Sequence, residues 1–292
     1  MLAGLLLLAL TAPPDVRDIP VAPGEVLRVT LSGTGRPVVL VPGMLGSAFA
    51  FRKLIPPLDS AGFQVIVIEP LGTGHSSRPG GANYSLGAQA GRLAAVLDSL
   101  GVRQAPVLGH SLGVSMVLRL ALRRPDLVAA IVASNGGPEE EAATRGVRRA
   151  ARFAFLLRIF GGRDAMRREL VKGLRETAGD PRWLTAEVID AYAAGSADDP
   201  GATLEVLKGM ARARDEPLAP RLGEVQVPVR LLVGGAPRGS GLKAAHAALM
   251  RDRLPRFAAD TVPGAGLHLH EERPDVVVGA VLAAAALSGR EP

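Results

Sequence analysis

A serine flanked by two glycines is the strongest chemical signal in the sequence. Residues 109–113 read Gly-His-Ser-Leu-Gly, which is the G-x-S-x-G pattern. An apolar, strand-like segment (105–108) precedes it and a helical pattern (112–124) follows it, so Ser111 is predicted to lie on a sharp strand-to-helix turn. Such a turn pushes the hydroxyl out over the edge of a sheet and makes Ser111 a candidate nucleophile. A merely structural serine in a glycine turn is the simpler alternative, and it leaves the flanking strand and helix unexplained.

Acyl chemistry at a serine also needs N–H donors for the developing oxyanion, and the sequence offers two. The N–H of Leu112 opens the helix that follows Ser111. The N–H of Met44 is the second candidate, in the loop Pro42-Gly43-Met44-Leu45-Gly46 after an apolar strand at 37–41. Gly43 and Gly46 would let that loop approach closely, although an ordinary strand-to-helix loop remains the alternative.

Taken together, the motifs resemble the α/β-hydrolase superfamily, in its lid-bearing branch of serine esterases, haloperoxidases and C–C hydrolases. Pro42-Gly43 matches the family's oxyanion position, and residues 69–76 resemble its Asp-x-x-Gly-x-Gly-x-Ser loop. Residues 109–113 match its nucleophile elbow, and 263–274 resemble its C-terminal histidine loop. The resemblance implies an α/β fold: a mostly parallel sheet flanked by helices, with an all-helical lid inserted between two late strands. Epoxide hydrolases of the superfamily carry Asp at the elbow, so Ser111 favours an ester, thioester or lactone substrate, or cleavage of a diketone.

The histidine loop departs from the family pattern by one residue. Leu267 stands where the resemblance places the catalytic histidine, His268 follows it, and His270 takes an auxiliary position. We expect His268 to serve as the base after a local loop shift, for which Gly264 and Gly266 provide freedom. The alternative is a broken triad, in a protein that keeps the fold and binds a ligand or partner without catalysis. His75, His110 and His246 are expected to be structural.

The triad acid is also missing from its usual place. The family carries Asp near position 237, where this chain has Pro237, or after an earlier strand, where it has Asn135. An asparagine can orient an imidazole although it cannot ionise. Residues 139–141 are three glutamates that could supply a carboxylate, but the first turn of a helix is the more ordinary place for them. No acid is assigned.

Strand and helix patterns alternate along most of the chain and then change. Short apolar runs alternate with helical stretches up to residue 137, and strand patterns return only at 227–233 and 257–262. We therefore predict an α/β-hydrolase core at 23–137 and 223–292, a helical lid at 138–222, and an apolar N-terminal segment at 1–22. In the lid, an apolar stripe of Phe153, Leu156, Leu157 and Phe160 suggests an apolar substrate pocket, although packing on the core is the simpler interpretation.

Composition excludes several kinds of site. The chain has 292 residues, no cysteine and a net charge of +6. Disulfides, thiolate metal sites and a cysteine nucleophile are therefore excluded. No metal-ligand spacing or dinucleotide fingerprint is found, so no metal or cofactor is expected. No nucleic-acid-recognition motif accompanies the positive charge, so no nucleic-acid partner is expected. The first ten residues resemble either a short export signal that lacks its positive region or simply an apolar N-terminus. They are too few to span a bilayer as a helix. Whether the protein is exported or cytoplasmic, and its oligomeric state, stay open.

Overall fold

A single eight-stranded sheet forms the centre of the molecule. The computed structural model describes residues 13–44, 46–143, 148, 162–195, 198–237 and 242–288. The strand order is β1-β2-β4-β3-β5-β6-β7-β8, and all neighbours from β4 to β8 are parallel, whereas β1 and β2 are antiparallel additions. The strands are β1 (Asp15–Ala22), β2 (Glu25–Ser32), β3 (Arg36–Val41), β4 (Phe63–Ile68), β5 (Ala105–His110), β6 (Val128–Ser134), β7 (Val229–Gly234) and β8 (Phe257–Val262).

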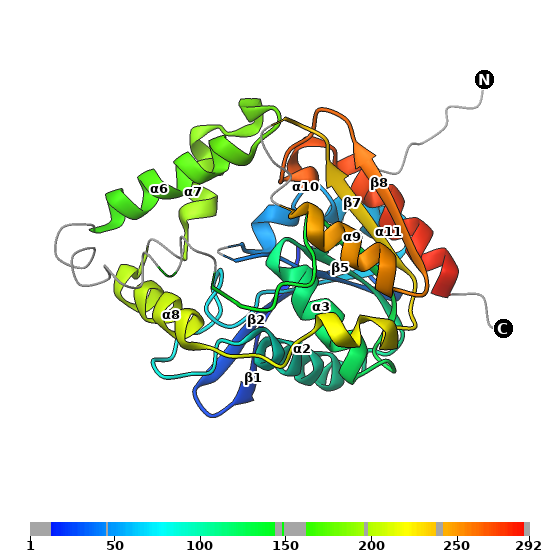
Figure 1. Ribbon diagram of the computed structural model, residues 1–292. Helices are drawn as coiled ribbons and strands as arrows, with labels where there is room; N and C mark the ends of the chain where they lie inside the picture. The colour runs from blue at the N-terminus through cyan, green and yellow to red at the C-terminus, as the bar shows by residue number, and fades with distance from the viewer. Residues whose placement is uncertain are drawn as a thin grey trace, which may run out of the picture.

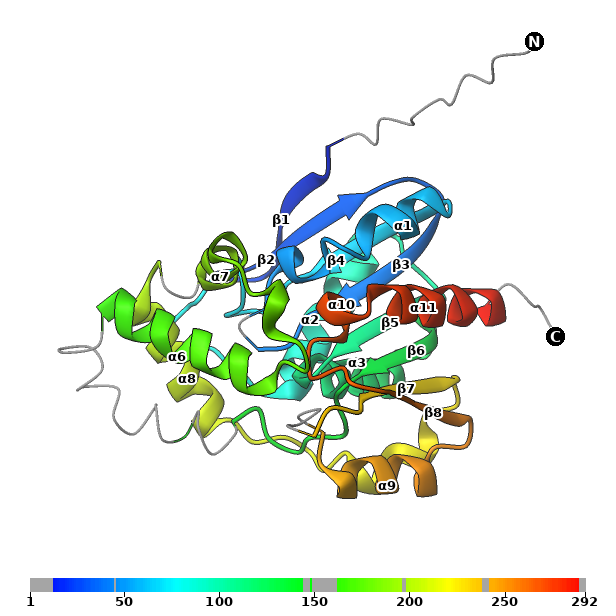
Figure 2. The ribbon, with the colours of Figure 1, turned by 90° about the horizontal axis from the view of Figure 1, so that it is seen from above.

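Helices cover both faces of the sheet and bury two separate apolar layers (Figures 1 and 2). One layer packs beneath α2 (Leu86–Ser99) and α3 (Leu112–Arg123), with a contribution from α9 (Ala244–Arg253). The other packs beneath α1 (Ile55–Ser60), the short α10 (Leu269–Glu272) and α11 (Pro274–Ser288). Apart from Arg36 and Pro37 at the start of β3, strands β3 and β5 are buried on both faces, which explains the apolar runs at 37–41 and 105–108. The fold is therefore the predicted α/β sheet flanked by helices.

The start of the sheet differs from the prediction. Residues 1–22 were predicted to be an apolar N-terminal segment outside the core. In the structure, Asp15–Ala22 forms β1 and pairs with β2 over nearly its whole length. The turn between them contains Gly24 at φ +75°, a conformation that glycine adopts without strain. The strand was missed because edge strands exposed on both faces, as most of β1 is, lack the apolar alternation that identifies a half-buried strand. The sheet therefore begins at Asp15.

The segment between β6 and β7, residues 138–222, is called the helical insertion here. Within its described residues lie α6 (Gly162–Thr177), α7 (Ala186–Ala193) and α8 (Pro200–Arg212), with short 3-10 turns at η3 (Pro181–Trp183) and η4 (Ala219–Glu224). These three helices lie to one side of the sheet (Figure 1). The glutamates at 139–141, expected in a first helical turn, lie instead in irregular backbone.

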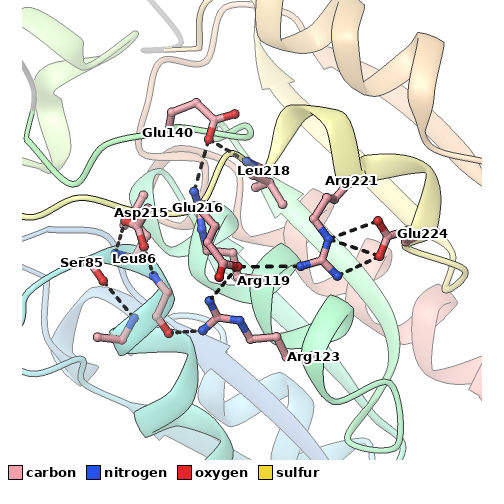
Figure 3. A network of polar contacts seen from close by, with 12 residues as sticks. Ser85, Leu86, Arg119, Arg123, Glu140, Asp215, Glu216, Leu218, Arg221 and Glu224 are labelled. Atoms are coloured by element: carbon pink, nitrogen blue, oxygen red, sulfur yellow. Dashed lines mark hydrogen bonds and ion pairs between the residues drawn. The ribbon is translucent and has the colours of Figure 1, made fainter.

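Polar contacts join the two ends of the helical insertion to the core (Figure 3). The Glu140 carboxylate accepts hydrogen bonds from the N–H groups of Leu218 (2.7 Å) and Ala219 (2.8 Å), so the entry of the insertion is fixed to its exit. Arg119 of α3 donates to the carbonyl of Glu139 at 3.0 Å. Asp215 accepts from the N–H groups of Leu86 and Gly87, both at 2.7 Å, at the start of α2. The insertion is thus anchored to α2 and to α3, the helix that follows Ser111.

Candidate active site

Ser111 sits on the predicted turn between β5 and α3, in a backbone conformation that side chains rarely adopt. Its φ is +50° and its ψ is −119°, and its N–H donates to the carbonyl of Ser134 at 2.9 Å. A non-glycine residue in this region costs about 1–3 kcal/mol and is kept where the surrounding structure enforces it. The residue is half-buried, whereas His110 beneath it is buried. Strand, strained turn and helix therefore have the arrangement that presents a serine nucleophile.

The two glycines around Ser111 are required by close packing. A Cβ on Gly113 would lie 2.7 Å from the carbonyl oxygen of Val41 and 2.8 Å from that of Pro42. A Cβ on Gly109 would lie 2.8 Å from the backbone nitrogen of Val114. All of these are backbone atoms, which cannot rotate away. The start of α3 is thus packed against the end of β3, where the loop predicted to supply an oxyanion donor begins.

We predict that Gly113→Ala lowers the free energy of unfolding by about 2–3 kcal/mol, because the new methyl group overpacks a backbone contact. Gly91→Ala is the matched control, since Gly91 lies inside α2 with no atom within 4 Å of its would-be Cβ. There the same substitution should stabilise the protein by up to about 1 kcal/mol through helix propensity. Urea unfolding of both variants checks this, and equal effects would contradict the packing argument.

The loop after β3 lies directly against the elbow. A Cβ on Gly43 would be 3.1 Å from both the Ser111 Cβ and the His110 carbonyl oxygen. The N–H of Gly46 donates to the carbonyl of Gly43 at 3.1 Å, which closes a turn around Met44 without using its N–H. The N–H of Leu112 opens α3, where no carbonyl one turn earlier is available to accept it. Both predicted oxyanion donors therefore belong to segments that meet at Ser111.

His268 lies close to the elbow but is held by the helical insertion. It is the residue just before α10 and is 7% exposed. Its ring centre lies 5.7 Å from that of His110, the residue preceding Ser111. The hydrogen bond that its Nε2 makes in the described structure joins it to the hydroxyl of Thr177 at 3.2 Å, rather than to Ser111. The structure thus brings His268 and Ser111 into one neighbourhood without linking them by a hydrogen bond.

Two aromatic residues of the insertion pack on His268. The ring of Trp183 lies 5.3 Å from the imidazole, and the ring of Tyr192 lies 6.4 Å from it. Their cluster also includes Leu174 of α6 and Phe49 of the turn η1 (Ala48–Phe51) in the core. The sequence alone does not point to Thr177, Trp183 or Tyr192 as site residues, because their proximity to His268 is created by tertiary folding.

Three histidines are packed together beneath the site. The His110 and His270 rings are 4.6 Å apart, and both approach His268 to 5.7 Å. Burial lowers the pKa of His110 to about 4 and, aided by His110, that of His268 to about 3. Burial also lowers the pKa of His270 well below its usual value. All three are therefore neutral at pH 7. In the described part of the chain, no group of three or more His, Asp or Glu side chains is arranged to hold a metal ion.

The three neutral histidines should make the fold sensitive to acid. Unfolding exposes them to water, where they take up protons below about pH 6.5. In the folded protein the pKa is about 4 for His110 and about 3 for His268, and that of His270 lies well below its usual value. Stability is therefore full above pH 6.5 and falls as the pH drops, by up to about 4 kcal/mol per pH unit for three groups. Urea unfolding between pH 7.5 and 5 measures this slope.

His270→Gln should reduce the slope of the free energy of unfolding against pH by about a third, since one of the three titrating groups is removed. His75→Gln is the control and should not reduce the slope, because the Glu69 carboxylate, as a hydrogen-bond acceptor, raises the pKa of this partly exposed histidine. A parent protein whose stability does not change between pH 6.5 and 5 would contradict the assignment of three neutral histidines.

Asn135 does not orient an imidazole. Its buried amide donates to the carbonyls of Gly266 and Leu267, each at 2.9 Å, and accepts from the N–H of Gly234 at 2.8 Å. The Leu267 carbonyl accepts a further hydrogen bond from His110 Nε2 at 3.1 Å. Asn135 therefore fixes the backbone of the histidine loop, and Leu267 is fixed with it at the position where the family resemblance places the histidine.

The remaining acids and histidines have other partners. Glu139 pairs with Lys243 at 2.7 Å, and His246 Nδ1 lies 3.3 Å from the same carboxylate. Glu69 accepts from the N–H groups of Ala48 (2.8 Å) and His75 (2.5 Å), so the glycine loop after β4 is held by this carboxylate. These contacts agree with structural roles for His75 and His246. The apolar stripe predicted at 153–160 lies outside the described residues.

Comparison with known proteins gives one consistent fold. Residues 36–160 match the family model of the alpha/beta hydrolase fold. A bifunctional epoxide hydrolase 2 from Sus scrofa is 35% identical over 116 residues, which is 39% of this chain and 21% of that protein. A protein provisionally named carbamate hydrolase RutD from Azorhizobium caulinodans is 39% identical over 106 residues, which is 36% of this chain and 39% of that one. The match thus spans well under half the length of these curated relatives.

Solved structures resemble the chain over almost its full length. The epoxide hydrolase CorEH superposes with a TM-score of 0.75 at 20% identity, covering 94% of this chain and 99% of that one. A thermophilic esterase from Thermogutta terrifontis gives a TM-score of 0.75 at 22% identity, covering 96% and 100%. At these identities the likeness establishes the fold. No helix in the described part of the chain is long and apolar enough to cross a membrane.

Proposed function

We propose that this chain, which matches the family model of the alpha/beta hydrolase fold over residues 36–160, is a serine hydrolase of apolar esters or related acyl substrates. The observation that carries the proposal is the conformation of Ser111, held at φ +50° with the oxyanion loop against its Cβ. A serine in a merely structural turn has no need of this strain or of the backbone contacts that enforce it.

In the proposed reaction Ser111 Oγ attacks the carbonyl carbon of the substrate, and His268 takes the hydroxyl proton. The N–H groups of Met44 and Leu112 stabilise the oxyanion. The leaving group then takes the proton from His268, and water hydrolyses the acyl-enzyme by the same steps in reverse order. Trp183 and Tyr192, with Leu174 nearby, give the insertion an apolar surface beside the base, which supports an apolar acyl group.

Hydrolysis of a series of p-nitrophenyl esters, from acetate to dodecanoate, tests the proposal. We expect slow, saturable hydrolysis with a preference for a medium or long acyl chain. The rate should be modest because His268 lacks a carboxylate partner, and the comparable loss in a complete triad costs about 10⁴-fold. No hydrolysis by the folded protein of any ester in the series would contradict the proposal.

A second candidate function is favoured by two observations: His268 Nε2 is bonded to Thr177, and Leu267 occupies the position where the family resemblance places the histidine. The protein would then be a catalytically silent member of the fold that binds an apolar ligand or a partner at the same site. It would bind long-chain acyl compounds without hydrolysing them. Calorimetric titration with a non-hydrolysable acyl ether distinguishes the two, when read beside the ester series.

A further inference from the structure

We infer that Thr177, the last residue of α6 in the helical insertion, positions His268 as the base, in the place that a carboxylate holds in a catalytic triad. The inference rests on the proposed function, since a positioning residue matters only if His268 acts on Ser111. It assigns a role in the reaction to a residue of the insertion rather than of the sheet.

The directions of the hydrogen bonds at the Thr177 hydroxyl determine which nitrogen of the His268 ring carries the proton. The Thr177 hydroxyl lies 2.8 Å from the carbonyl oxygen of Gly173 and 3.4 Å from that of Leu174. Carbonyl oxygens only accept, so the single hydroxyl proton is donated back into the helix, as is common for threonine. Toward His268 Nε2, at 3.2 Å, the hydroxyl oxygen must therefore accept. Nε2 carries the proton, and the lone pair of the neutral ring is on Nδ1.

Backbone contacts fix the end of α6, where Thr177 lies, to the histidine loop. The Thr177 carbonyl accepts from the N–H of Leu267 at 2.8 Å, directly before His268. A Cβ on Gly266 would lie 2.2 Å from that same carbonyl oxygen, so the two backbones are in contact. The Glu272 carboxylate accepts from the N–H groups of Gly179 (3.1 Å), Asp180 (3.0 Å) and Gly266 (3.1 Å), which clamps both segments together. The Thr177 hydroxyl is thereby held in a fixed position relative to the ring.

The other ring nitrogen is left available. His268 Nδ1 is buried and has no hydrogen-bond partner among the described residues. Neither the Asn135 amide nor the Glu272 carboxylate bonds to it, because Asn135 holds the backbone of the histidine loop and Glu272 accepts from backbone N–H groups. The ring is neutral at pH 7, as a base must be before it accepts a proton.

In the step that this arrangement implies, the Ser111 Oγ–H proton passes to His268 Nδ1 as Oγ bonds to the acyl carbon and the carbonyl π electrons move onto the oxygen, which becomes the oxyanion. The imidazolium keeps its Nε2–H on the Thr177 oxygen. As the carbonyl re-forms and the bond from the acyl carbon to the alcohol oxygen breaks, the proton on Nδ1 goes to the departing alcohol. This step uses the ring in the reverse of the usual order, in which Nε2 faces the nucleophile.

Thr177→Val tests the inference because valine has nearly the same shape and cannot accept the hydrogen bond. We expect kcat for a p-nitrophenyl ester to fall about fivefold to tenfold, the size of one neutral hydrogen bond, with KM unchanged. Thr177→Ser should restore kcat. Thr185→Val is the matched control, since Thr185 caps α7 with its hydroxyl and touches no histidine ring in the described structure; it should lower stability and leave kcat unchanged.

A second readout does not depend on activity. Nitrogen-15 NMR of ring-labelled histidine, with His268→Gln to assign the signal, should show His268 protonated at Nε2 in the parent and in Thr177→Ser. The preference should be lost in Thr177→Val. A parent in which His268 is protonated at Nδ1, or a Thr177→Val variant with unchanged kcat, would overturn the inference while leaving the hydrolase proposal intact. An inactive parent would overturn both.

Discussion

Replacing Ser111 by alanine is expected to reduce ester hydrolysis by about 10³-fold or more, to the background rate. The remaining residues cannot form an acyl-enzyme, and nucleophile removal in comparable enzymes costs up to about 10⁶-fold. Initial rates with the best p-nitrophenyl ester of the series measure the effect. His268→Ala should cause a smaller loss, of about 10²-fold, because only proton transfer is removed.

A matched pair of variants separates the chemistry from the fold. Ser111→Gly should be as inactive as Ser111→Ala but more stable than it by about 1 kcal/mol, because glycine adopts φ +50° without strain. A Ser111→Ala variant that kept a tenth or more of the parent rate would show that hydrolysis occurs elsewhere on the protein.

Glu271→Gln is expected to lower the free energy of unfolding by about 3 kcal/mol, the largest effect on stability that we predict for a single side chain. The Glu271 side chain is fully buried and accepts from Arg52 at both oxygens, from Lys53 at 3.2 Å and from the Tyr192 hydroxyl at 2.9 Å. Removing one member of a buried ion pair typically costs 3–5 kcal/mol, and partial exposure of Arg52 and Lys53 places this case at the lower end.

Tyr192→Phe is the control for this substitution, because it leaves both ion pairs in place. It removes the hydroxyl's hydrogen bonds with Glu271 and with His270 Nε2 (3.2 Å) and should cost about 1–2 kcal/mol. A double-mutant cycle from urea unfolding gives the coupling between the two residues. A Glu271→Gln variant within 0.5 kcal/mol of the parent would mean, on the scale of ordinary surface substitutions, that the ion pair does not stabilise the fold.

The sequence was informative wherever function depends on local pattern. Residues 109–113 predicted the strand, the turn and the helix, because a G-x-S-x-G pattern between a strand and a helix is typical of a sharp strand-to-helix turn with the serine at its tip. The loss of strand patterns after residue 137 likewise predicted helices between β6 and β7. Both signals lie within a few residues of the features they predict.

Contacts between distant segments were not predictable in this way. Thr177 and His268 are 91 residues apart and meet only because Glu272 and Leu267 join α6 to the histidine loop. A helical pattern gives no sign of which threonine ends beside a histidine. Asn135 was considered for an imidazole, and its use by three backbone groups became visible only in three dimensions. β1 was missed because its exposed faces carry no apolar alternation.

Covalent labelling by a fluorophosphonate probe tests the central claim most directly, because it reports an activated serine whatever the substrate. We expect the parent protein to be labelled at Ser111, as located by peptide mass mapping. Labelling should disappear in Ser111→Ala, fall sharply in His268→Ala and persist in His270→Ala. A folded parent protein that takes up no probe, or a label on another residue, would contradict the account.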